Sequence, residues 1–90
     1  MRSLSTEQLL QLAELVCAEY QTRIVNYAAL ALLGHHVQLN IAGVKIFSTP
    51  QEAATSLSQL IRQLRPLQKH NEILAQLAAK ITLRLAAEDF

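Results

Sequence analysis

The sequence has few charged residues and few aromatic ones, and both shortages narrow what the protein can do. Only 17% of its 90 residues are Asp, Glu, Lys or Arg, the formal net charge is +1, and Trp is absent. A net charge so close to zero gives no general attraction to nucleic acid or to an anionic membrane. The single cysteine, Cys17, excludes a disulfide scaffold and is typical of a cytoplasmic protein with a reduced thiol.

A long apolar run is also missing. Residues 24–44 contain no Asp, Glu, Lys or Arg, but polar side chains and glycines interrupt them, and the unbroken apolar run covers only residues 28–33. A membrane-spanning helix needs about 20 predominantly apolar residues. The sequence therefore predicts no membrane association, and its first residues do not have the pattern of a secretory signal.

Aliphatic residues are what the sequence has in abundance, because 51% of it is hydrophobic and only 4% is aromatic. They recur mostly at helical spacing, which predicts an all-α protein. At this length we expect one domain over residues 1–90, folded as a compact bundle of five to six helices.

A capping motif marks the first predicted helix, over about residues 6–20. Ser5 is followed three residues later by Gln8, and the side chain of each satisfies a backbone N–H of the other in a capping box. Apolar residues then recur at i, i+3 and i+4, which predicts one buried face. The predicted buried residues are Leu9, Leu12, Ala13, Val16 and Tyr20.

A second capping motif marks a later helix. Thr49 has the N-cap position, Pro50 the first helical position and Glu52 the third, so three start signals agree. Pro66 ends or redirects this helix. A final long helix is predicted over about residues 69–87.

The middle of the chain gives a less uniform pattern. Residues 23–33 have almost no polar face, which predicts a helix central to the fold, and Gly34 is expected as its left-handed C-terminal residue. Residues 35–48 are irregular, and residues 37–47 fit two alternatives. One is a short helix over 37–42 followed by an extended connection packed on the core, and the other is a small hairpin. We favour the helix because isolated hairpins are marginally stable.

No pattern in the sequence predicts catalysis, a cofactor or a metal site. His35 and His36 are adjacent and diverge by about 100° on a helix, whereas two helical metal ligands need i, i+3 or i, i+4 spacing. His70 and Cys17 have no partner at ligand spacing. Because no phosphate-binding glycine loop or nucleophile elbow is present either, we predict a protein that is not an enzyme.

The few charges separate along the chain according to sign, and two leucines fall outside the buried stripes. The predicted acidic patch is Glu7, Glu14 and Glu19, the predicted basic patch is Arg62, Arg65 and Lys69, and the predicted exposed apolar contacts are Leu15 and Leu83. Opposite patches on one domain can join copies head to tail, and a contact that does not close a ring forms a filament. The charge pattern thus favours protein–protein interaction and a homo-oligomer.

The order of these features resembles the bacterial death-like domains, also called effector-associated domains. The resemblance covers residues 5–82 and is carried by aliphatic patterns: Leu32-Leu33-Gly34, Ile41-Ala42-Gly43, Leu57-x-x-Leu60-Ile61 and Ile73-Leu74-Ala75-Gln76-Leu77. It implies a death-fold-like helical adaptor that pairs with like domains and recruits an effector in bacterial immune or conflict signalling. It implies no catalytic residues. The way the chain begins and ends also suggests the N-terminal module of a longer protein.

Two alternatives from other classes stay open. The Arg62, Arg65 and Lys69 cluster is compatible with a small nucleic-acid-binding regulator, although the charge balance gives that function little support. An obligate helical homodimer with a structural role would explain the apolar excess through a core shared by two chains.

Overall fold

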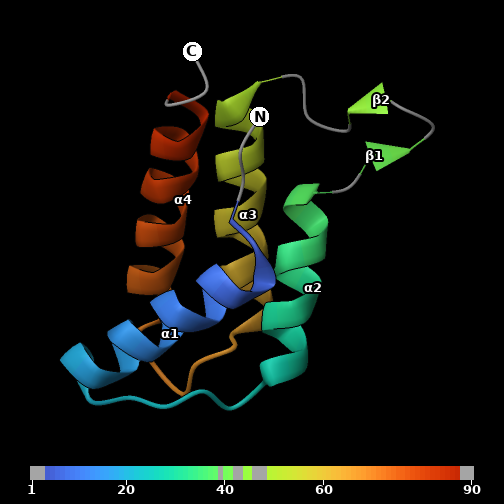
Figure 1. Ribbon diagram of the computed structural model, residues 1–90. Coiled ribbons are helices and arrows are strands. Elements are labelled where there is room, and N and C mark those ends of the chain that lie inside the picture. The colour runs from blue at the N-terminus through green and yellow to red at the C-terminus, as the bar shows by residue number, and fades with distance from the viewer. Residues whose placement is uncertain (1–3, 39, 42–43, 46–48, 88–90) are drawn as a thin grey trace.

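The computed structural model describes residues 4–38, 40–41, 44–45 and 49–87, and the side chains at 35–48 and 86 lie outside this description (Figure 1). The elements are α1 (Thr6–Tyr20), α2 (Tyr27–Gln38), β1 (Asn40–Ile41), β2 (Val44–Lys45), α3 (Pro50–Leu64) and α4 (Asn71–Ala87). The described part is therefore all-helical apart from one minimal hairpin. It contains four helices, and the expected five to six are not confirmed.

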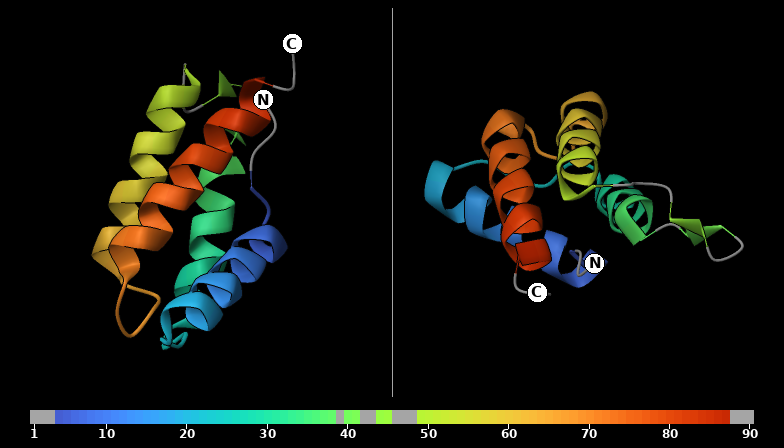
Figure 2. Two further views of the ribbon diagram at one scale, coloured as in Figure 1. Left: turned by 90° about the vertical axis from the view of Figure 1, so that its left-hand side faces the viewer. Right: turned by 90° about the horizontal axis from the view of Figure 1, so that it is seen from above.

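The helices form a layer with one helix across it. Figures 1 and 2 show α2, α3 and α4 side by side with alternating directions, while α1 crosses one face of this layer. α3 and α4 form the most extensive pair, α2 packs against α1 and α3, and α1 also packs against α4. The core lies between these elements. Its largest fully buried hydrophobic side chains are Leu9, Leu30, Leu33, Leu57, Ile61, Leu67 and Leu74.

Both predicted helix starts are confirmed. The Ser5 Oγ accepts a hydrogen bond from the Gln8 N–H (3.1 Å), and the Gln8 Oε1 accepts one from the Ser5 N–H (2.9 Å). The Thr49 Oγ1 accepts a hydrogen bond from the Glu52 N–H (3.2 Å) at the start of α3. These contacts are local, so the capping sequences were sufficient to predict them.

The buried face of α1 follows the predicted spacing except at its end. Leu9, Leu12, Ala13 and Val16 are buried, but Tyr20 is 43% exposed. Tyr20 is the last residue of the helix, and Gln21 after it turns into the left-handed region. The helix therefore ends before Tyr20 is enclosed by the core.

Of the helix predicted over residues 23–33, residues 27–33 are helical, but the predicted start and the predicted central position are wrong. The helix begins later, at Tyr27, with the Asn26 Oδ1 accepting a hydrogen bond from the Ala29 N–H (3.1 Å), and it runs on to Gln38. It lies at the edge of the layer, because it packs on α1 and α3 and makes no contact with α4. A helix with apolar residues on every side can be buried on every side or can expose one apolar face to water. The sequence pattern did not distinguish these two cases.

Gly34 lies inside α2, so the prediction that it ends a helix is also wrong. A β-carbon built at this position would lie 2.9 Å from both the backbone N and the Cα of Thr6. Any other residue would therefore collide with the backbone at the start of α1. The glycine allows close approach of two helices and does not serve as a cap.

The segment after α2 follows the hairpin alternative where it is described. β1 and β2 are antiparallel, with Asn40 paired to Lys45 and Ile41 to Val44. A separate helix over 37–42 is not formed by the described residues, because α2 continues through Gln38 and residues 40–41 form a strand. The prediction that the side chains of 44–47 pack on the core lies outside the described residues.

Among the helices described, none combines the length and the apolar composition that crossing a bilayer requires.

Candidate protein interaction surface

Two connections that are far apart in the sequence lie together at one end of the molecule. Residues 21–26 join α1 to α2, and residues 65–70 join α3 to α4; Ile24 and Leu67 form an isolated antiparallel bridge between them. The further hydrogen bonds are Val25 N–H to Pro66 O (2.8 Å), Gln68 N–H to Arg23 O (2.9 Å) and Lys69 N–H to Thr22 Oγ1 (3.1 Å). Among the described residues other than glycine, those with positive φ are Gln21 (54°), Arg65 (50°) and His70 (66°), all in these two connections. Backbone hydrogen bonds thus hold the two turns in a fixed relation.

Asn71 fixes the second of these turns from inside. Its Oδ1 accepts a hydrogen bond from the Leu67 N–H and its Nδ2 donates one to the Leu67 C=O, each at 2.9 Å. Asn71 is 9% exposed and Leu67 is 1% exposed. A buried amide that satisfies both backbone groups of a buried residue leaves no polar group without a partner.

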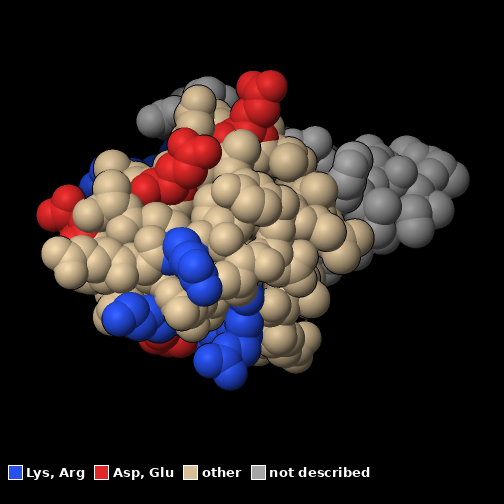
Figure 3. Space-filling view, turned by 90° about the horizontal axis from the view of Figure 1, so that it is seen from below, with Lys and Arg blue, Asp and Glu red and all other residues tan. Residues whose placement is uncertain are grey.

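The joined turns bring three basic side chains to this end, and we call Arg23, Arg65 and Lys69 the basic end. All three residues are exposed, and among the described residues none of them forms an ion pair. Figure 3 looks at this end and shows several Lys and Arg side chains gathered there. The predicted basic patch did not include Arg23. No pattern of neighbouring residues could have placed Arg23 at the same end as Arg65, because only the pairing of the two turns brings them there.

Arg62, the third member of the predicted basic patch, has an acidic partner within the fold. Its Nε and Nη2 donate hydrogen bonds to the two carboxylate oxygens of Glu72, at 2.6 and 2.8 Å, so the pair links α3 to α4. This hydrogen bonding lowers the pKa of Glu72 and raises the pKa of Arg62. Because its charge is already neutralised, Arg62 offers less to a partner than the basic end does.

The predicted acidic patch lies on α1. Glu7, Glu14 and Glu19 are all exposed, and none forms an ion pair within the described part of the chain. Glu7 and Glu14 are two helical turns apart, and the exposed Gln11 lies between them, so they share one face. In Figure 3 the acidic side chains lie mainly along the upper edge and the basic ones mainly below them. On the face that Figure 3 shows, most acidic side chains are therefore separated from most basic ones.

Several large apolar side chains are also exposed. The two predicted from the sequence are Leu15, which is 62% exposed, and Leu83, which is 38% exposed. The sequence analysis did not single out Val25 (53%), Tyr27 (64%) and Leu32 (61%), which belong to α2 and the turn before it. A helix at the centre of the fold would bury these side chains, so the predicted central position did not indicate that they are exposed.

Cys17 and His70, which the sequence analysis considered as metal ligands, each pack against other side chains. Burial, and to a smaller degree the charge of Glu14, raises the pKa of the Cys17 thiol, which disfavours the nucleophilic thiolate. His70 packs beside the ring of Tyr20, with the ring centroids 5.6 Å apart. Among the described residues, no three His, Cys, Asp or Glu side chains come together as metal ligands would. The side chains of His35 and His36 lie outside the description.

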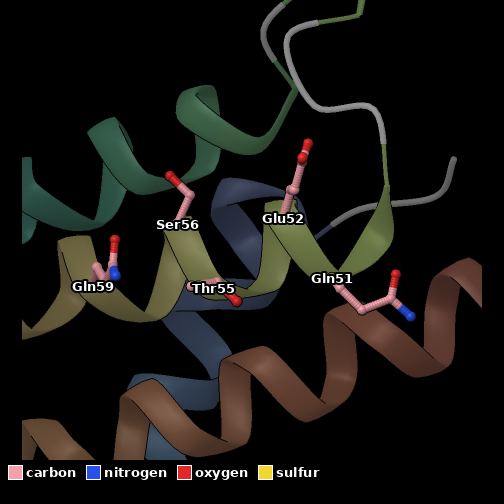
Figure 4. A pocket seen from close by; sticks show the side chains of 5 residues that line it. All are labelled: Gln51, Glu52, Thr55, Ser56 and Gln59. Atoms are coloured by element: carbon pink, nitrogen blue, oxygen red, sulfur yellow. The ribbon is translucent and has the colours of Figure 1, made fainter.

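A shallow hollow of about 390 Å³ lies along the exposed side of α3 (Figure 4). Its lining residues are Gln51, Glu52, Thr55, Ser56 and Gln59. All come from one helix, and Figure 4 shows Glu52 and Ser56 pointing to the α2 side while Gln51 points to the α4 side. Its polar groups are the carboxylate of Glu52, the hydroxyls of Thr55 and Ser56, and the amides of Gln51 and Gln59.

No family model, curated protein or solved structure matches this chain. What the protein does must therefore be inferred from the charges and the apolar side chains of its own surface.

Proposed function

We propose that the protein is a non-enzymatic adaptor domain that associates with copies of itself or with like domains, as the resemblance to bacterial death-like domains implies. In this role it recruits an effector in bacterial immune or conflict signalling in the cytoplasm. The observation that carries the proposal is the division of the surface into an acidic face on α1 and the basic end, Arg23, Arg65 and Lys69. The charges on both lack ion-pair partners among the described residues.

Opposite charges on one domain favour a head-to-tail contact. The acidic face of one copy is complementary to the basic end of the next, so the joined pair keeps one free surface of each kind. Such a heterologous contact forms a ring if the rotation closes and a filament if it does not. Exposed ion pairs are individually weak and are screened by salt, so the association is expected to be reversible and salt-sensitive.

Sedimentation velocity at several protein concentrations, at low and at high salt, tests the head-to-tail contact. We expect oligomers at low salt that grow with concentration and dissociate at high salt. R65E and E14R should each be monomeric, whereas their mixture should associate because each supplies the surface that the other lacks. The matched control is R62Q/E72Q, which removes an ion pair without changing the net charge and should assemble like the wild type.

Two outcomes would contradict self-association through the charged patches. A wild-type protein that stays monomeric at low salt at every concentration would overturn self-association through these patches. So would R65E and E14R variants that assemble as the wild type does.

A second candidate function follows from the same basic end. Three cations that have no ion-pair partner among the described residues lie on two joined turns and could contact phosphates of nucleic acid. The acidic face of α1 and the low net charge act against this, so the contact would be weak. Titration of duplex DNA at low salt tests it: binding that R65E abolishes would support it, and no binding would exclude it.

A further inference from the structure

Over residues 27–32, the outward face of α2 is apolar and exposed. Tyr27 and Leu32 are 64% and 61% exposed, and the exposed Ala28 lies one helical turn before Leu32. The opposite face of the same helix carries the buried Ala29, Leu30 and Leu33, which pack into the core. Burying exposed apolar area is favourable by roughly 25 cal/mol per Å². The helix therefore offers a second apolar face that the folded domain leaves in water.

This face also has no formal charge. Residues 24–38 contain no Asp, Glu, Lys or Arg. Figure 3 shows the right-hand side of the described surface, where α2 lies, free of acidic and basic side chains. Acidic or basic partners thus gain no electrostatic complementarity here.

A second copy of the same face satisfies these conditions. In a twofold contact the residues near the axis meet their own copies, so a charged group at the centre of the contact lies near a like charge. The acidic face of α1 and the basic end would each repel their own image, whereas the uncharged face of α2 would not. Ala28 is small, which permits close approach of two helices, and Tyr27 covers a large area with few rotatable bonds.

We propose that α2 forms a twofold contact with α2 of a second copy, centred on Tyr27, Ala28 and Leu32. The contact is independent of the head-to-tail charge contact. It joins domains that are already folded, because each chain buries its own core residues such as Leu30 and Leu33. Stable interfaces bury about 800 Å² on each partner, more than three side chains supply, so this dimer should be weak and concentration-dependent. Together with the charge contact it would link dimers into longer assemblies.

High salt separates the two contacts, since it screens charges and leaves apolar contacts intact. At high salt we expect the wild type to form dimers as its concentration rises, in sedimentation velocity. L32E should raise the dissociation constant at least tenfold, because it places two like charges in a desolvated contact. The matched control is L15E on α1, since Leu15 and Leu32 are almost equally exposed, at 62% and 61%. Circular dichroism should show that both variants keep the wild-type helix content.

Crosslinking gives a second measurement that does not depend on disrupting the contact. In a C17S background, A28C should form an intermolecular disulfide under mild oxidation at high salt. A18C, at an exposed alanine of α1, should not.

The proposal is overturned if the wild type is monomeric at high salt at every concentration. It is also overturned if L15E weakens the dimer as much as L32E does, or if A28C crosslinks no better than A18C. None of these outcomes affects the low-salt charge contact, which R65E and E14R test separately.

Discussion

α2 and α3 are neighbouring helices of one layer, but the exposed face of α3 is polar and that of α2 is apolar. α3 buries residues such as Leu57 and Ile61 and exposes polar ones such as Gln51 and Gln59. α2 buries Leu30 and Leu33 but exposes Tyr27 and Leu32. The high hydrophobic content of the chain is therefore not all core, since part of it is surface on α2. A surface of this kind is typical of a contact site between proteins.

The attachments of these helices differ as well. α3 and α4 are linked by the Arg62–Glu72 ion pair, and the turn between them is fixed by Asn71. α2 depends on its buried side chains and on the close approach of Gly34 to Thr6. Substitutions can therefore compare the contributions of the buried and exposed faces of α2 to stability. They can also compare the packing of α2 with the polar contacts that hold α3, α4 and the turn between them.

The largest expected effect compares adjacent leucines of α2. Leu33 is fully buried and Leu32 is 61% exposed. L33A should lower the free energy of unfolding by about 3 kcal/mol, because it removes buried methyl groups and leaves a cavity. L32A should change it by less than about 0.5 kcal/mol at a concentration where the protein is monomeric. Urea unfolding measures both, and equal losses would show that α2 does not have one buried and one exposed face.

The next effect tests the helix contact at Gly34. G34A should cost about 2 kcal/mol, because the added β-carbon meets the backbone of Thr6, and the loss should exceed the roughly 1 kcal/mol that alanine gains in helix propensity. A28G on the exposed face is the reciprocal control, and it should cost about 1 kcal/mol. Thermal unfolding of both variants gives the comparison, and a stabilised G34A would contradict the close approach.

An effect of similar size compares two asparagines that precede or begin helices. N71A removes an amide that satisfies both backbone groups of the buried Leu67, and it should cost about 2 kcal/mol. N26A removes the exposed cap of α2, and it should cost about 1 kcal/mol. Urea unfolding ranks the two. If N26A were the more damaging, the turn before α4 would not depend on Asn71.

The smallest effect is the pH dependence of the Arg62–Glu72 pair. The pKa of Glu72 is lowered from its ordinary value of 4.5, so its ionised form stabilises the folded protein. This contribution is present above pH 4.5 and is lost as the pH falls through the lowered pKa of the folded state. E72Q should therefore melt slightly below the wild type at pH 7 and at the same temperature as the wild type in strong acid. A difference that grows in acid would contradict the sign of the pKa shift.

The sequence by itself determined the features that depend on nearby residues. The capping box at Ser5, the start of α3 at Thr49 and the buried face of α1 were predicted because caps and helical periodicity involve residues within about two turns of one another. The exposure of Leu15 and of the acidic residues of α1 followed from the same periodicity.

Only the tertiary structure decided which apolar face of α2 stays in water and which cations share a surface. Apolar residues surround α2, so its periodicity could not show that its neighbours would cover one face alone. Arg23 and Arg65 lie at the same end of the molecule because two distant turns pair through their backbones. Arg62 is neutralised by Glu72 of α4, which is ten residues further along the chain. Each of these outcomes depends on contacts between residues far apart in the chain, and local propensities do not encode them.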